Sequence, residues 1–253
     1  MVPETLNLRA RWGTRQETVG DCAKKMFAFL NDLAKCDDIF AQPWLKSSGT
    51  NLQDVEVSVE SLQSLLEKGR VRRDFGKSIV EHLGYDSSRL WNGSKNNCVF
   101  VFVQCGAYPN PQVLPSANCV WLDLPDDNLT TKWVARPQQL LEITNVVVKN
   151  WDPDWARIST NKIDAEIYRA NPYRGQMVGW LTYISERYGP LPSLPKECST
   201  ERVGELGTLI SITSINERLT ISNPAHVALV RQLSEVLEQA GVLAPIPPTN
   251  LNV

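Results

Sequence analysis

Residues 99–103 read Val-Phe-Val-Phe-Val, the longest strongly apolar run in the chain. Each of these side chains is β-branched or aromatic, and such residues favour β-strands. Since no polar residue alternates with them, we expect a strand that is buried on both faces. The run is much too short for a membrane span, which needs about 20 apolar residues in a helix. It therefore predicts a strand in the interior of a sheet.

Other segments extend this sheet toward both ends of the sequence. Leu6, Leu8 and Ala10 alternate with polar residues and predict a half-buried first strand. Residues 37–60 are expected to hold loop and a short strand. Pro125 is expected to end the strand before it, because proline cannot donate a hydrogen bond to a neighbouring strand. The remaining strands are predicted at 118–124, 155–159, 178–185 and 208–214.

Helices are predicted where capping residues precede apolar stripes of helical spacing. Thr18 can cap the first helix, and Asp21 stands three residues on, as in a capping box. Asn223 can cap the last helix, with Pro224 at its first position and Gly241 beyond its end. The predicted helices are 18–36, 61–68, 137–149 and 224–240.

The order of these elements predicts an α+β fold. Strands and helices do not alternate regularly, which argues against a doubly wound parallel sheet. We expect a mixed or antiparallel sheet flanked by helices. Because each part of the 253-residue chain holds several strands and a long helix, we predict two packed α+β halves, 1–130 and 131–253, or one continuous domain.

The charge of the chain is nearly balanced, with a formal net charge of −2. A nucleic-acid binder needs a basic face, so this balance gives no support for one. One basic stretch, residues 68–74, allows two interpretations. It is either a solvated turn after a helix, in which Asp74 pairs with an arginine, or a contact for phosphate or an acidic partner.

The cysteines indicate a reducing compartment. No two of them have C-x-x-C spacing, so a zinc ribbon or a thioredoxin-like site has no support. The first residues contain no apolar segment that could serve as a secretory signal. We therefore expect a cytoplasmic protein that is not inserted in a membrane and has free thiols. The cysteines are at positions 22, 36, 98, 105, 119 and 198.

The usual motifs of enzymes are absent from the sequence. It has no phosphate loop, no dinucleotide-binding glycine motif, no H-E-x-x-H and no G-x-S-x-G. An acidic residue followed two positions later by lysine, part of the catalytic pattern of restriction-type nucleases, also occurs nowhere. His82 and His226 are the only histidines. We therefore predict no catalytic residue, no cofactor and no metal site.

Two acidic places could serve a partner. Asp123, Asp126 and Asp127 follow a predicted strand, and residues 151–155 read Trp-Asp-Pro-Asp-Trp. The second motif is either a turn from helix to strand with its tryptophans in the core, or an aromatic and acidic patch that meets a basic partner. The predicted partner-binding residues are Asp123, Asp126, Asp127, Trp151, Asp152, Asp154 and Trp155.

An ordered series of short motifs resembles a known family. The chain is similar to family 52 of the bacterial polymorphic-toxin immunity proteins, and the likeness covers about residues 6–243. No single motif is decisive, but their order is specific. The matching stretches are residues 12–17, 69–74, 90–93, 105–108, 122–125, 151–155 and 178–183.

The resemblance implies a protein partner. Members of this family neutralise toxins with a restriction-endonuclease-like nuclease domain, often delivered by a type VI secretion system. It implies an antidote that binds a cognate nuclease toxin in the cytoplasm and is itself no enzyme. The toxin-contacting residues of the family cannot be assigned to positions here, so the predicted patches rest on their chemistry alone.

A second function stays open on the residues alone. Cys105 or Cys198 could act with His226 as a hydrolase of unknown substrate. Changing every cysteine and histidine without unfolding the chain separates the two functions. Such a change abolishes a hydrolase and leaves an antidote protective.

Overall fold

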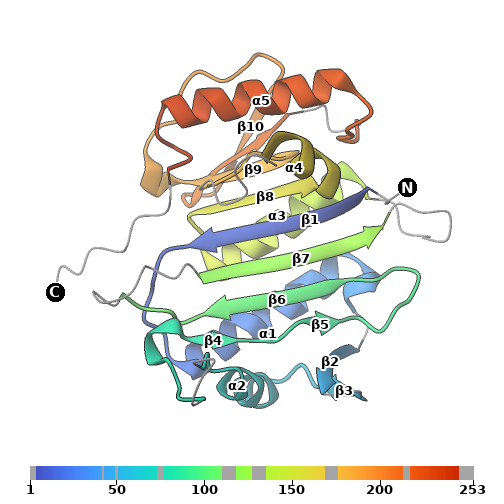
Figure 1. The fold of residues 1–253 in the computed structure, drawn as a ribbon, viewed down its shortest axis with the longest axis vertical. Helices are drawn as coiled ribbons and strands as arrows, with labels where there is room; N and C mark the ends of the chain where they lie inside the picture. The colour runs from blue at the N-terminus through green and yellow to red at the C-terminus, as the bar shows by residue number, and fades with distance from the viewer. Residues whose placement is uncertain are drawn as a thin grey trace.

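The main feature of the computed structural model is one large antiparallel sheet with helices on both faces (Figure 1). The structure describes residues 4–41, 43–48, 51–72, 77–109, 118–126, 135–168, 176–212 and 217–244. The strands are β1 (Thr5–Trp12), β2 (Trp44–Ser48), β3 (Asn51–Val55), β4 (Tyr85–Asp86), β5 (Leu90–Trp91), β6 (Phe100–Cys105), β7 (Asn118–Asp126), β8 (Trp155–Thr160), β9 (Leu181–Ser185), β10 (Ser199–Val203) and β11 (Gly207–Ser211). The helices are α1 (Val19–Cys36), α2 (Val59–Lys68), α3 (Pro137–Trp151), α4 (Asn161–Tyr168) and α5 (Pro224–Gln239). This confirms the predicted α+β class with an antiparallel sheet.

Strand β1 lies in the middle of the sheet. The strand order is β10-β11-β9-β8-β1-β7-β6-β5-β2-β3, and β4 pairs with β6 away from this path. β1 pairs with β7 on one side and with β8 on the other, so the sheet runs without a break from strands before residue 130 to strands after it. The division into halves at 1–130 and 131–253 stays a prediction.

One face of the sheet is covered by α1 and α3. Thr18 caps α1 as predicted, because its hydroxyl oxygen accepts a hydrogen bond from the Asp21 amide at 3.1 Å. The buried side of α1 packs against α3 and belongs to the same hydrophobic core as the inward side chains of β1. In Figure 1 both helices lie behind the strands. This layer forms because each helix carries an apolar stripe that must be buried.

The other face of the sheet is covered only in part. Helix α4 lies in front of β8, α5 lies beside α4 in front of β10, and no described helix lies in front of β6 and β7 (Figure 1). Asn223 caps α5 as predicted, and its side-chain oxygen accepts the amide of Ala225 at 3.0 Å. Helix α4 was not predicted. It has only eight residues, of which Ile163 and Tyr168 are buried, so its apolar pattern is too short to recognise.

The prediction that residues 99–103 are buried on both faces is wrong. Val101 and Val103 are fully buried, whereas Phe100 and Phe102 are only partly buried. The strand therefore has one face toward α1 and α3 and another toward the uncovered side. The run lacks alternation between apolar and polar residues because the uncovered face here carries aromatic side chains in place of polar ones.

The other differences from the predicted strands have local causes. β7 continues through Pro125 to Asp126. Proline is tolerated there because the pairing of β7 with β1 shifts register between Thr5 and Asn7, and proline is accepted at irregularities of this kind. β10 was missed because four of its five residues are exposed and polar. Edge strands of this kind are stabilised by pairing, so they carry little apolar pattern.

Candidate functional site

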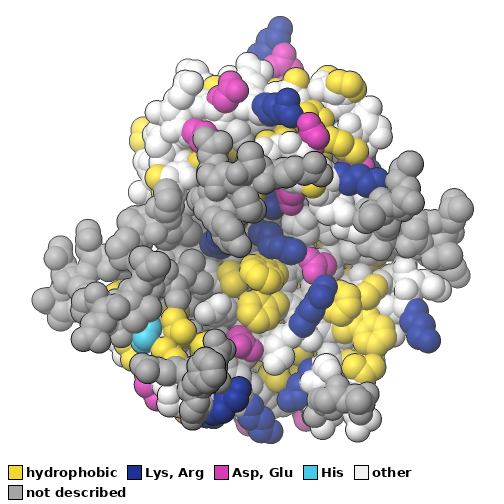
Figure 2. Space-filling model, viewed as in Figure 1, with side chains coloured by type: hydrophobic (Ala, Val, Ile, Leu, Met, Phe, Trp, Pro, Cys, Tyr) yellow, Lys and Arg dark blue, Asp and Glu magenta, His cyan; other side chains and the backbone are white. Residues whose placement is uncertain are grey.

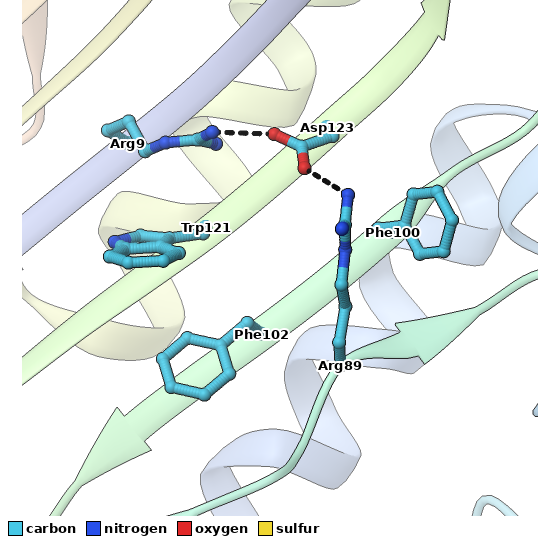
Figure 3. Close-up of a pocket in the computed structure, with 6 residues that line it drawn as sticks. All are labelled: Arg9, Arg89, Phe100, Phe102, Trp121 and Asp123. Atoms are coloured by element: carbon cyan, nitrogen blue, oxygen red, sulfur yellow. Dashed lines mark hydrogen bonds and ion pairs between the residues drawn. The ribbon is translucent and has the colours of Figure 1, made fainter. Parts of the chain in front are cut away.

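The uncovered face carries a cluster of aromatic and arginine side chains. These side chains line a hollow of about 350 Å³ (Figure 3). We call the cluster the aromatic–arginine patch. Its members are Arg9, Arg89, Phe100, Phe102, Trp121 and Asp123.

The register of three neighbouring strands brings the patch together. On β7, Trp121 lies opposite Arg9 of β1 and opposite Phe102 of β6. Two residues further along β7, Asp123 lies opposite Phe100. Alternate residues of a strand share a face, so these side chains all point to the uncovered side of the sheet. Arg89 enters from the segment immediately before β5, as Figure 3 shows.

Two arginines hold Asp123 between them. Arg9 donates from its Nη2 atom to Oδ1 of Asp123 at 2.6 Å. Arg89 donates from its own Nη2 atom to Oδ2 at 2.8 Å. With one carboxylate against two guanidinium groups, the centre of the patch has an excess of positive charge.

The aromatic rings support both arginines. The Arg89 guanidinium carbon lies 3.8 Å from the centroid of the Phe100 ring, and that of Arg9 lies 5.4 Å from the Trp121 ring. Such cation–π contacts restrict where the charges lie. Trp121 also packs against Phe102, with ring centroids 5.2 Å apart. Even so, 42% of Trp121 is exposed.

Of the first predicted acidic place, only Asp123 can be located fully. The side chain of Asp126, and the whole of Asp127, lie outside the described residues. Trp121 was missed by sequence reasoning. Its signal was present, because Trp121 stands between the buried Val120 and Leu122 at the position where a half-buried strand would carry a polar residue.

The second acidic place is a structural corner between α3 and β8. Trp151 and Trp155 are each 1% exposed, so a partner cannot contact their rings in this conformation. Trp151 stacks on Trp12 at 5.5 Å, and the Trp155 indole donates to the carbonyl of Met177. These positions match the interpretation of residues 151–155 as a turn with its tryptophans in the core.

The aspartates of this corner bond mainly within the chain. Asp154 accepts the amide of Gly13 at 2.7 Å and the Nε atom of Arg187 at 2.7 Å. Asp152 pairs with Arg187 at 2.9 Å, and its left-handed backbone (φ 43°) ends α3. Arg15 donates to the carbonyl of Asp152 and lies 3.6 Å from its carboxylate. The corner therefore has two arginines for its two carboxylates.

The cysteines and His226 do not have the properties of a hydrolase site. A nucleophilic thiol needs a lowered pKa. Burial raises the pKa of Cys198 to about 11, and a hydrogen bond with Cys22 together with burial raises the pKa of Cys105. His226 is itself held, because its Nδ1 atom accepts the amide of Thr220 and its Nε2 atom lies 2.8 Å from Glu217.

Three further features of the described residues bear on metal binding, membrane insertion and the basic stretch. Among them, no three histidine, cysteine, aspartate or glutamate side chains are grouped as metal ligands. No helix in the described ranges is long and apolar enough to cross a bilayer. Within the basic stretch 68–74, Arg70 pairs with Glu67 and Glu81, whereas Asp74, expected to pair with an arginine, lies outside the described residues.

The exposed tryptophan, phenylalanines and arginines have the chemistry of a protein-binding module, because these residue types are frequent at the centres of protein interfaces. Comparison with protein families identifies the module. The chain belongs to the family "Immunity protein 52", whose family model matches residues 4–246. That match covers every described strand and helix of the fold, and the family supports an immunity function.

A solved structure shares the fold. The chain is similar to the Pseudomonas aeruginosa T6SS protein PA0821, with a TM-score of 0.54 and 12% sequence identity. The alignment covers 92% of this chain and 76% of that one. At this identity the similarity concerns the fold alone. A comparison with curated proteins gives no match.

Proposed function

We propose that this chain binds and neutralises a cognate nuclease toxin and thereby protects the cell that makes it. The observation that carries the proposal is the family match over residues 4–246. The similar fold of a protein described as a T6SS protein supports delivery of the toxin by type VI secretion. A nuclease acts on DNA, so the antidote is proposed to work in the cytoplasm, with a protein partner and without nucleic acid or membrane.

Of the two predicted acidic places, we propose the one with Asp123, Asp126 and Asp127 as the toxin-facing surface; of these three, only Asp123 has a described side chain. Asp123 lies beside Trp121, and a half-exposed tryptophan is the type of residue that dominates binding energy in interfaces. The corner at Asp152 and Asp154 is the weaker candidate, because its tryptophans, Trp151 and Trp155, are each only 1% exposed.

Neutralising a lethal enzyme requires tight binding. A nanomolar dissociation constant corresponds to about −12 kcal/mol, and a standard interface buries about 1,600 Å² in total. The uncovered face of β1, β7 and β6 can supply this chain's part of such an interface, because it is held rigid by the sheet and by the helices behind it.

The proposal is tested with the toxin encoded beside the gene of this chain. We expect cells that express the toxin to survive only when the chain is produced with it. We also expect the purified chain to stop DNA cleavage by the purified toxin at a one-to-one ratio. If the chain protects cells from a toxin that leaves DNA intact, the nuclease part of the proposal is wrong. If it neither binds nor protects, the immunity proposal is wrong.

A further inference from the structure

The aromatic–arginine patch is positively charged at its centre, although it contains the predicted acidic residue. Asp123 uses both carboxylate oxygens on its own arginines. Arg89 is 59% exposed and bonds Asp123 through only one of its two terminal nitrogens. Arg89 also lines the hollow (Figure 3). Arg11 adds charge to the same face, since it stands two residues after Arg9 on β1.

The apolar part of the patch is in the interior of the sheet. In the described ranges the exposed large hydrophobic residues are Leu52, Ile79 and Trp121. Leu52 is on the edge strand β3 and Ile79 is in a loop, whereas Trp121 is on β7, between β1 and β6. Figure 2 shows hydrophobic side chains in the middle of this face, with charged groups of both signs beside them. A central aromatic group with charges around it has the layout of a binding hot spot.

We infer that the aromatic–arginine patch is the centre of the toxin interface, and that it receives a toxin segment carrying a carboxylate next to an apolar side chain. The carboxylate forms a charge-assisted pair with Arg89, for which a guanidinium fork is well suited. The apolar side chain covers Trp121 and Phe102. Asp123 acts as a positioning residue that fixes the two guanidinium groups. This inference rests on the proposed function and reverses the charge expected of the toxin at this point.

A single-stranded nucleic acid is the other macromolecule that exposed rings and arginines can bind. One feature favours the protein segment. The chain has a net charge of −2, and non-specific nucleic-acid binding depends on neutralising phosphates with lysine and arginine.

The test measures association and dissociation rates between the full chain and the toxin encoded beside it, with variants of the patch and matched controls. Trp121→Ala is paired with Leu52→Ala, since both remove an exposed apolar side chain. Arg89→Glu is paired with Arg202→Glu, because Arg202 is similarly exposed (54%) and also forms one ion pair. Arg89→Lys keeps the charge without the fork. Circular dichroism shows that each variant is folded.

We expect Trp121→Ala to weaken binding about thirtyfold or more, mainly through faster dissociation. Arg89→Glu should weaken it at least about tenfold and slow association, with Arg89→Lys between it and the wild type. Asp123→Asn should leave association as fast or faster. Leu52→Ala and Arg202→Glu should bind like the wild type.

Four outcomes overturn the inference. If the wild type binds the toxin and the patch variants bind equally well, the surface is wrong and the immunity function stands. If Asp123→Asn slows association while Arg89→Glu speeds it, the toxin surface is basic and the inferred carboxylate is wrong. If a labelled 12-mer of single-stranded DNA binds the chain tightly and Trp121→Ala abolishes that binding, the patch serves nucleic acid. A wild-type chain that does not bind the toxin refutes both proposals.

Discussion

The two halves of the sheet differ in how they are covered. Every residue of β8 and β9 is buried, because α3 packs behind this half and α4 packs in front of β8, with α5 beside α4. On β6 only alternate residues are buried, because described helices cover its rear face but not its front face. We call these the covered half and the open half.

One aspartate–arginine pair in each half shows how a covering helix changes the exposure and the role of such a pair. In the covered half Arg157 is 3% exposed and forms two hydrogen bonds of 2.8 Å with Asp164 of α4. In the open half Arg89 is 59% exposed and forms one with Asp123. The first pair can only hold α4 to the sheet, whereas the second is accessible to another molecule. An aspartate–arginine pair therefore has a structural role where a helix covers it, and it is available for binding where no described helix covers it.

The largest expected effect is that of removing a tryptophan from the covered half. Trp155→Ala should lower the free energy of unfolding by about 3–5 kcal/mol, because it leaves a cavity and the Met177 carbonyl loses its donor. Trp121→Ala in the open half is the matched control and should cost less than about 1 kcal/mol. Urea unfolding of both variants measures this. Equal losses would contradict the distinction between the halves.

A smaller effect is expected where the buried arginine loses its partner. Asp164→Ala should cost about 3 kcal/mol, because the Arg157 guanidinium stays buried without a counter-charge. Thermal unfolding at neutral pH measures the loss. The double variant Asp164→Ala with Arg157→Leu should recover part of it, since the uncompensated charge is then gone. A loss below about 1 kcal/mol in the single variant would show that water reaches this pair.

The covered half should also give an alkaline pH dependence. Burial raises the pKa of Tyr183 on β9 from 10.0 to about 12. Between these values the unfolded chain loses this proton while the folded chain keeps it. Stability is therefore full below pH 10 and falls as the pH rises toward 12, by about 1–2 kcal/mol. Denaturant unfolding of Tyr183→Phe should show a shallower fall over this range. An identical pH dependence would refute the assignment to Tyr183.

The smallest expected effect concerns the exposed pair. Asp123→Ala should change the free energy of unfolding by less than about 1 kcal/mol, because water solvates Arg9 and Arg89 when their partner is removed. Urea unfolding in low and high salt measures it, and the small difference should shrink as salt increases. A loss as large as that of Asp164→Ala would mean that the patch is a structural element of the fold.

Local signals in the sequence were sufficient for the long helices but not for the covering of the sheet. The Thr18 and Asn223 caps were predicted correctly because a cap involves residues only two or three positions apart. Whether Phe100 is buried depends on where α4 and α5 pack, and those helices come much later in the chain. A strand pattern alone contains no information about such distant elements.

The candidate site was predictable only in part for the same reason. Asp123 was selected as part of an acidic cluster, but its partner Arg9 is 114 positions away in the sequence. In the sequence, Asp123, Asp126 and Asp127 form an acidic cluster. In the structure, Asp123 lies between two arginines, so the described part of this cluster has an excess of positive charge. Trp151 and Trp155 were weighed as partner contacts, and the structure places both in the core.

The central position of β1 has a consequence for how the chain is made. This strand is synthesised before both of its neighbours, which begin at residues 118 and 155. At about 5–20 residues per second, a ribosome needs several seconds or more to produce them. During that time the backbone edges of β1 lack both neighbouring strands. The sheet can therefore close only after β8 has been synthesised, and a chain interrupted before β8 would expose an aggregation-prone edge.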